Sequence, residues 1–192
     1  MRNGLTRGTV LVLLLLLLPV ASFADGRAGG AGGLIVGNQV TEYPFLEQYR
    51  VESNTLGLSY VGGFGYSVSE RGMISGGFGM GMFDPYEESG IGAGVGGAIG
   101  GWRILRRPVY LAVTSWTGIG GVGIERPALG AEEGYFIFFQ ELSLELGLPF
   151  FSWFTPTFFA GYQVMGSVLP APILQFVSYT PVIGFRLGWG DL

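Results

Sequence analysis

The chain has 192 residues, of which 48% are hydrophobic and 12% charged, and glycine alone supplies 36 positions. This composition is too apolar for a disordered chain, and its glycines lack the three-residue period of collagen. A net charge of −4 argues against a nucleic-acid partner. The sequence has no histidine and no cysteine, the residues on which most recognisable catalytic and metal-binding sites depend. We therefore expect no catalytic residues, no cofactor and no metal site.

Residues 1–24 have the pattern of an export signal. Arginines near the start precede an apolar run from Val10 to Val20, and small residues stand at Ser22 and Ala24. This is the order of a signal peptide that is cleaved after Ala24. The apolar run is shorter than the roughly 20 residues that a membrane-spanning helix needs. We predict removal of residues 1–24 and a single domain formed by residues 25–192.

The rest of the chain alternates between two classes of side chain with period two, the pattern of β-strands. The alternation is clearest in residues 56–69, 134–148 and 176–189, where large apolar residues alternate with small or polar ones. Residues 109–124 are apolar or small on both faces, so the orientation of that strand stays open. Eight strands are predicted, at residues 34–40, 56–69, 73–83, 90–105, 109–124, 134–148, 153–166 and 176–189.

Strand length and connection length indicate a membrane barrel. Most predicted strands exceed the five or six residues usual in soluble sheets, and about 9–11 residues of tilted strand cross a bilayer. Long connections alternate with short ones: 41–54, 84–89, 125–133 and 167–175 are long, and 70–72, 106–107 and 149–152 are short. Tight turns at one end and longer loops at the other are typical of transmembrane barrels.

In this pattern the chain resembles the small eight-stranded outer-membrane β-barrel proteins, as a class. The resemblance implies an all-β fold, an eight-stranded antiparallel up-and-down (meander) transmembrane β-barrel. It also implies location in the cell outer membrane, with outer-membrane lipid and the barrel-assembly machinery as partners. Such barrels usually end in an outward-facing aromatic residue, but here Gly190, Asp191 and Leu192 follow Trp189, which is the candidate for that role.

A membrane barrel reverses the soluble rule, because lipid is the apolar phase. We therefore expect large apolar faces to point outward and small or polar faces to point inward. On residues 56–69 the expected inward set is Gly57, Ser59, Gly63, Gly65 and Ser67. Aromatic residues are expected in girdles at the membrane surfaces: Tyr60, Tyr66, Trp102, Tyr110, Trp116, Trp153, Tyr162, Tyr179 and Trp189.

A few polar side chains are predicted to line the interior: Glu141, Glu145, Gln163 and Arg186. If the tight turn after Leu148 sets the register, Glu145 lies near Thr155 and at a similar depth to Arg186. The simplest interpretation is an ion-paired plug, since a buried charge needs a partner. A proton or ion path and a catalytic site are the alternatives, although Glu141 and Glu145 lie roughly 13 Å apart along one strand, too far for a glycosidase pair.

The long loops carry an acidic cluster, and the first loop has a helical pattern. The cluster is interpreted as a solvated surface, with the collection of divalent cations that bridge lipid headgroups as the alternative. Its residues are Asp84, Glu87, Glu88, Glu132 and Glu133. Thr41 and Pro44 fit the start of a short helix within residues 41–50, which would cover one mouth of the barrel.

Two matches to G-x-G-x-x-G occur, at Gly92 to Gly97 and at Gly118 to Gly123. Both lie within predicted strands, whereas a nucleotide-binding fingerprint needs a helix after its glycines. We therefore expect no nucleotide site.

The sequence favours a non-catalytic outer-membrane protein with a structural or adhesive role in the envelope. Two alternatives stay open: a soluble periplasmic barrel that binds an apolar ligand inside, and a narrow channel. The soluble barrel requires aromatic faces inside and glycine faces in water, and eight strands limit the width of a channel.

Overall fold

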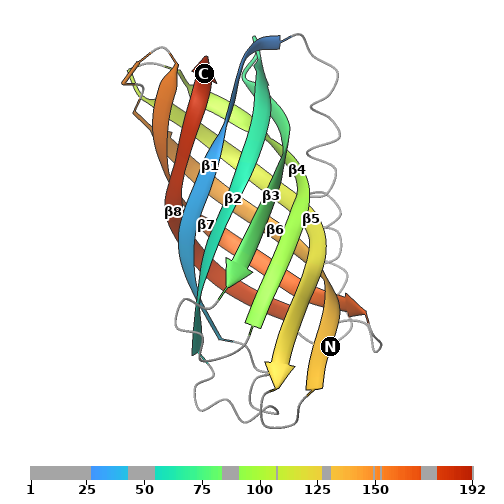
Figure 1. Cartoon of the computed structure of the whole chain (residues 1–192). Helices are drawn as coiled ribbons and strands as arrows, with labels where there is room; N and C mark the ends of the chain where they lie inside the picture. Colours follow the sequence, from blue (N-terminus) through green and yellow to red (C-terminus); the bar gives the residue numbers. More distant parts are fainter. Residues whose placement is uncertain are drawn as a thin grey trace, which may run out of the picture.

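The computed structural model describes residues 27–42, 55–83, 91–106, 108–126, 131–148, 150–151, 153–169 and 177–191. These residues form a closed barrel of eight antiparallel strands in chain order (Figure 1). The strands are β1 (Arg27–Glu42), β2 (Thr55–Ser69), β3 (Met73–Phe83), β4 (Ile91–Leu105), β5 (Tyr110–Arg126), β6 (Ala131–Gly147), β7 (Phe154–Leu169) and β8 (Val177–Asp191). The predicted fold class, an eight-stranded meander barrel, is confirmed.

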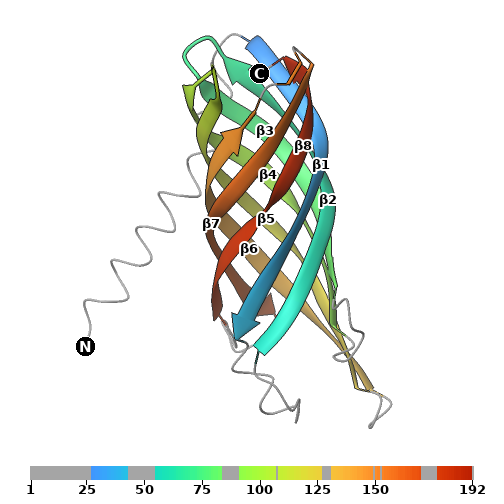
Figure 2. The same cartoon turned by 90° about the vertical axis from the view of Figure 1, so that its left-hand side faces the viewer.

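Each strand pairs with its neighbours in sequence, and β1 closes the barrel against β8 (Figure 2). The closing register runs from Gly30 opposite Asp191 to Gln39 opposite Val182. Closure removes the unpaired strand edges of an open sheet, so the backbone groups along the wall are bonded within the sheet. The described part of the chain contains no helix that is long and apolar enough to span a membrane.

The two ends of the barrel differ. The turn end holds the tight connections β2–β3, β4–β5 and β6–β7, together with the start of β1 and the end of β8, at the top of Figure 1. The loop end holds the other connections, whose residues 43–54, 84–90, 127–130 and 170–176 lie outside the described residues. The predicted acidic residues Asp84, Glu87 and Glu88 fall in these segments, as does most of the predicted helix. Thr41 and Glu42 are instead the last residues of β1.

Six strands extend further than predicted at one end or both. β1 begins at Arg27 rather than Leu34, β5 continues to Arg126, and β6 begins at Ala131. The long connection predicted at residues 125–133 is therefore mostly strand, and the alternation of long and short connections fails there. Glu125 pairs with Glu132 in the ladder. Backbone pairing does not require apolar side chains, so side-chain polarity indicated the wrong boundary.

The faces of β6, β7 and β8 point as predicted. Leu144 and Phe185 are 52% and 59% exposed on the outer wall, whereas Glu145 and Arg186 are 1% exposed inside. β5, whose orientation the sequence left open, turns Thr114 and Trp116 inward. On this side of the barrel the exterior is apolar, whereas the inner faces carry all the buried charged residues of the described part together with apolar ones such as Phe139 and Phe159.

On β2, β3 and β4 the predicted orientation is wrong. Tyr60, Phe64 and Tyr66 are buried in the interior, and Gly63 and Gly65 lie on the outer wall. Phe78 and Met80 of β3 and Val95 and Ile99 of β4 are buried in the same way, whereas Trp102 and Ile104 near the turn end of β4 are exposed. The reason is volume, because the interior of an eight-stranded barrel is filled by side chains. A glycine-lined wall would leave a void and lose dispersion contacts.

Four aromatic residues are missing from the predicted girdles, Tyr60 and Tyr66 because β2 is inverted, and Tyr110 and Trp116 because β5 turns them inward. Buried in the interior are Tyr60, Tyr66, Tyr110 and Trp116; exposed on the outside are Trp102, Trp153, Tyr162 and Trp189. Ser59 and Ser67, also predicted inward, are half-buried on the outward-facing side of β2. The side chains of Gly57 and Tyr179 lie outside the described part.

The two glycine motifs lie within β4 and β5 and face each other across that strand pair. Gly92 is opposite Gly123, and Gly97 is opposite Gly118. Their glycines therefore belong to the barrel wall, in the extended backbone that the sequence predicts for them.

Candidate functional site

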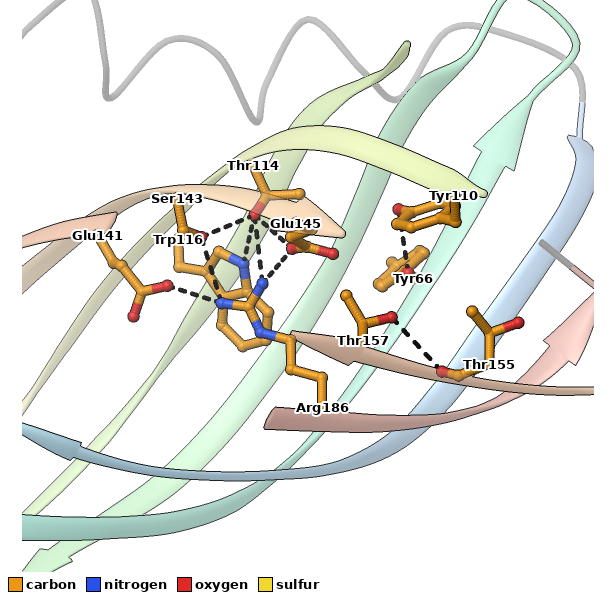
Figure 3. Close-up of polar contacts among 10 residues, drawn as sticks. All are labelled: Tyr66, Tyr110, Thr114, Trp116, Glu141, Ser143, Glu145, Thr155, Thr157 and Arg186. Atoms are coloured by element: carbon orange, nitrogen blue, oxygen red, sulfur yellow. Dashed lines mark hydrogen bonds and ion pairs between the residues drawn. The ribbon is translucent and has the colours of Figure 1, made fainter. Parts of the chain in front are cut away.

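The charged residues of the interior come together around Arg186. This arginine projects from β8, Glu141 and Glu145 project from β6, and Thr114 projects from β5 (Figure 3). Residues two apart on a strand share a face, so Glu141, Ser143 and Glu145 form one row along the inner wall. Arg186 reaches this row from two strands away.

One guanidinium group binds both carboxylates. Arg186 Nη2 donates to Glu141 Oε1 at 2.6 Å, and Arg186 Nη1 donates to Glu145 Oε1. All three side chains are 1% exposed, so water screens their attraction little. We call Glu141, Glu145 and Arg186 the ionic cluster. Its two carboxylates and one guanidinium group give it a formal net charge of −1.

Hydrogen bonds from uncharged side chains extend the ionic cluster onto β5. Thr114 Oγ1 donates to Glu145 Oε1 at 2.5 Å, which leaves it to accept from Trp116 Nε1 at 3.2 Å and from Ser143 Oγ at 3.1 Å. Buried polar groups normally have such partners. Within the described part of the chain, two buried polar atoms have none: the Tyr60 hydroxyl and Arg186 Nε.

Aromatic rings enclose the guanidinium group from two sides. Arg186 Cζ lies 4.0 Å from the ring centroid of Trp116 and 4.0 Å from that of Phe159. A cation over a ring face is attracted by the ring quadrupole, more strongly when water is excluded. Trp116 also contacts Phe78 and Phe64, with centroid distances of 4.9 and 5.8 Å. The ionic cluster is thus continuous with the aromatic side chains that β2 and β3 supply.

Nearer the turn end, a second set of polar contacts lines the interior. The hydroxyl groups of Tyr66 and Tyr110 lie 3.2 Å apart, and Thr157 Oγ1 donates to the carbonyl of Thr155 at 3.4 Å (Figure 3). All four residues are buried. Polar contacts therefore continue from the ionic cluster towards the turn end.

The structure brings three of the four predicted interior residues into direct contact, Glu141, Glu145 and Arg186. Gln163 is also buried and lies opposite Glu141 in the β6–β7 ladder. The expected register was wrong, because Glu145 pairs with Phe159 and not near Thr155. Leu148 N donates to the carbonyl of Pro156, so the turn takes up more residues than the sequence suggested.

The predicted acidic cluster at the loop end is not part of this site. Glu132 and Glu133 lie in the first residues of β6, opposite Glu125 and Ile124, and their side chains lie outside the described part. The described residues contain no group of three or more potential metal ligands.

Sequence reasoning missed several partners of Arg186. Thr114 and Trp116 lie on the strand whose two faces could not be told apart, because both are apolar or small. Phe159 lies on the same face as the predicted interior residue Gln163, but an apolar ring on that face gives no sign that it contacts the arginine. The weak signal that remained was the spacing of Thr114 and Trp116, two residues apart and hence on one face.

Comparisons with known proteins identify the fold and nothing finer. No family model matches the sequence, and no curated protein matches it. Neisserial surface protein A shares the fold with a TM-score of 0.59 and 6% identity, over 87% of this chain and 99% of that one. The N-terminal β-barrel domain of Pseudomonas aeruginosa OprF matches with a TM-score of 0.53 and 10% identity, over 86% of this chain and 99% of that domain. Ail, the attachment invasion locus protein of Yersinia pestis, matches with a TM-score of 0.52 and 11% identity, over 86% of this chain and 99% of that one. The resemblance to small outer-membrane barrels is confirmed at the level of the fold.

Proposed function

We propose that the protein is an outer-membrane barrel with a filled, non-catalytic interior and a structural or adhesive role in the cell envelope. The observation that carries this proposal is the distribution of polarity across the wall. The ionic cluster is inside, whereas large apolar residues are exposed on the outside of β1, β6, β7 and β8. A membrane provides the apolar surroundings that this outer surface needs.

Export and assembly follow from the same proposal. Residues 1–24 act as a signal peptide, outer-membrane lipid surrounds the wall, and the barrel-assembly machinery inserts the chain. Trp189 supports the last step, because it is 42% exposed on the outer wall near the end of β8. Gly190 N donates to the carbonyl of Trp153, which fixes the strand end against the β6–β7 turn.

A gene deletion complemented with loop variants separates a structural role from an adhesive one. In the variant, Gly-Ser sequences of equal length replace residues 84–90 and 170–176. A structural role predicts that wild type and variant both restore resistance of the cells to detergent. An adhesive role predicts that only wild type restores attachment to surfaces. If deletion changes neither detergent resistance nor attachment, the proposal is wrong.

The narrow-channel alternative is tested by conductance. The ionic cluster and the rings packed on it lie in the interior of the barrel. Purified protein in planar bilayers should therefore pass no steady current comparable to that of a sixteen-stranded porin. Large, sustained channels would favour the channel and contradict the filled interior.

The soluble-barrel alternative gains support from the body of β2–β4, where most large residues are inside and glycines face outward, as that alternative requires. It is opposed by β6–β8, where residues such as Leu146 and Ile183 would be left in water. Contiguous apolar surface of this extent is uncommon on soluble monomers. A mature chain that is freely soluble without detergent would favour the soluble barrel over the membrane barrel.

A further inference from the structure

Outside the ionic cluster, the charged side chains that the structure describes gather at the turn end of the barrel. Among residues whose side chains are described, the charged ones that lie outside the deep interior are Glu70, Arg71, Arg103 and Arg106. All four belong to the β2–β3 turn or to the end of β4, at the turn end. Arg71 and Arg106 are exposed, and Arg103 is half-buried. Three of the four are arginines, so this part of the rim is positively charged.

Backbone hydrogen bonds hold these turns together. Gly72 N donates to the carbonyl of Ser69 at 3.0 Å, and Arg103 N donates to the carbonyl of Gly72 at 2.7 Å. Gly72 has a φ of 89°, a conformation that favours glycine, which allows the tight turn. The β2–β3 turn is thereby fixed against β4, with Arg71 and Arg103 on directly bonded segments. The positive rim is part of the rigid wall.

An apolar wall lies directly below the positive rim. Trp102, Ile104 and Leu105 are 49%, 53% and 46% exposed at the end of β4, just before Arg106. Each strand residue advances about 3.3 Å, so the apolar side chains begin within a few ångströms of the arginines. A molecule with a phosphate head and hydrocarbon tails matches both parts at once, because arginine binds phosphate and the wall binds acyl chain.

We propose that the positive rim, through Arg71 and Arg106, and the apolar wall below it, through Trp102 and Ile104, together bind anionic phospholipids of the leaflet at the turn end. The inference rests on the proposed membrane location and goes beyond it, because it assigns a lipid class to one place on the barrel. Arginine favours the phosphodiester through paired N–H donors. The adjoining apolar wall favours an intact lipid over a free anion.

Native mass spectrometry of the refolded chain, residues 25–192, tests the proposal. Protein in detergent is mixed with equal amounts of phosphatidylglycerol and phosphatidylcholine of the same acyl chains. Wild type should retain phosphatidylglycerol in preference, and Arg71→Gln with Arg106→Gln should reduce that preference by about fivefold for each arginine. Arg126→Gln removes the same charge at the opposite end of β5 and should leave the preference unchanged.

Three results would overturn the proposal. They are equal retention of the two lipids by wild type, an equal loss of preference in Arg126→Gln, and displacement of the lipid by millimolar inorganic phosphate. The comparison of lipids on wild type holds even if a variant does not fold. Failure of the proposed membrane location would look different, since the chain would then remain soluble without detergent.

Discussion

Arg186 makes three kinds of contact at once. It pairs with Glu141 and Glu145, and this pairing links β8 to β6 across β7. It also packs against the rings of Trp116 and Phe159. A buried ion pair often contributes little net stability, because desolvation offsets the attraction between the charges. Removal of one partner is costly, since the other charge is left buried and unpaired. The ionic cluster therefore favours the native register, because a shifted β8 would leave charges without partners.

Replacement of Arg186 tests this reasoning. Arg186→Met keeps much of the side-chain volume but leaves Glu141 and Glu145 without a cation, and should lower the free energy of unfolding by about 3–5 kcal/mol. Adding Glu141→Gln and Glu145→Gln should restore most of the loss, because the uncompensated charges are then gone. Urea unfolding of the folded barrel in vesicles measures both. Equal stability of Arg186→Met and wild type would show that the ionic cluster contributes nothing.

Tyr60 and Tyr66, both buried in the interior, allow a comparison of two hydroxyl groups in different surroundings. The Tyr60 hydroxyl is buried with no partner among the described residues, whereas the Tyr66 hydroxyl lies 3.2 Å from that of Tyr110. Tyr60→Phe removes an unsatisfied group and should leave stability unchanged or raise it, while Tyr66→Phe should cost about 1 kcal/mol. The same urea unfolding experiment compares them. The reverse order would contradict the described hydrogen bonding.

At the scale of the strand, the sequence predicts where strands lie better than which face is inside. On β6 and β8 the charged residues Glu141, Glu145 and Arg186 mark the inner face, because they need partners that lipid does not offer. β2 and β3 have no such marker, and alternation of large with small residues is the same whichever side is filled. Which face of β2 and β3 points inward depends on how much volume the other strands leave in the interior. The sequence of one strand does not reveal that volume.

Glycines on β2 test the corrected orientation. A Cβ atom at Gly65 would meet nothing within 4 Å, whereas one at Gly62 would overlap the carbonyl of Gly79 and lie 2.7 Å from Met80 Cα. Gly65→Ala should therefore be neutral or slightly stabilising, since glycine weakens strands. Gly62→Ala should cost about 1–3 kcal/mol, the usual range for overpacking. The midpoints of urea unfolding of the two variants measure this difference. Equal effects would contradict the placement of Gly65 on the outer wall and Gly62 in the interior.

The outer face of β6 allows a test of membrane depth. Leu144 is 52% exposed in the body of the strand, and Leu148 is 51% exposed just beyond its end. Leu144→Arg should cost about 2–4 kcal/mol in a bilayer, and Leu148→Arg about 0–1 kcal/mol, because the cost falls towards the membrane surface. The yield of heat-modifiable, folded protein measures assembly. Similar yields for both variants would mean that this wall does not face hydrocarbon.

At the scale of the whole molecule, the barrel has two unlike halves. The body of β2–β4 has glycines outside and most of its large residues inside, with Trp102 and Ile104 exposed near the turn end. β6–β8 have large apolar residues outside, and inside they bury charged and polar residues together with Phe139 and Phe159. The two halves together fill one interior, with the rings of Phe64 and Phe78 packed on Trp116. Neither half would fill the barrel alone.

This division explains how much of the site could be predicted. The three charges of the ionic cluster could be predicted, since few charged residues occur on barrel strands and each needs a partner. The aromatic enclosure by Trp116 and Phe159 could not. β5 has no charged residue that marks the inner face on which Trp116 lies, and the contact of Phe159 with Arg186 depends on the β7–β8 register, which the hydrophobic pattern did not define.

Membrane fractionation of the mature chain tests the central claim most directly, namely that the apolar outer wall lies in an outer membrane and the ionic cluster is inside. The full sequence is expressed in a bacterium with two membranes, and the envelope is separated into periplasm, inner membrane and outer membrane. We predict that residues 25–192 are found with the outer membrane, are released only by detergent, and migrate differently before and after boiling. Recovery of a folded protein in the periplasm without detergent would contradict the claim.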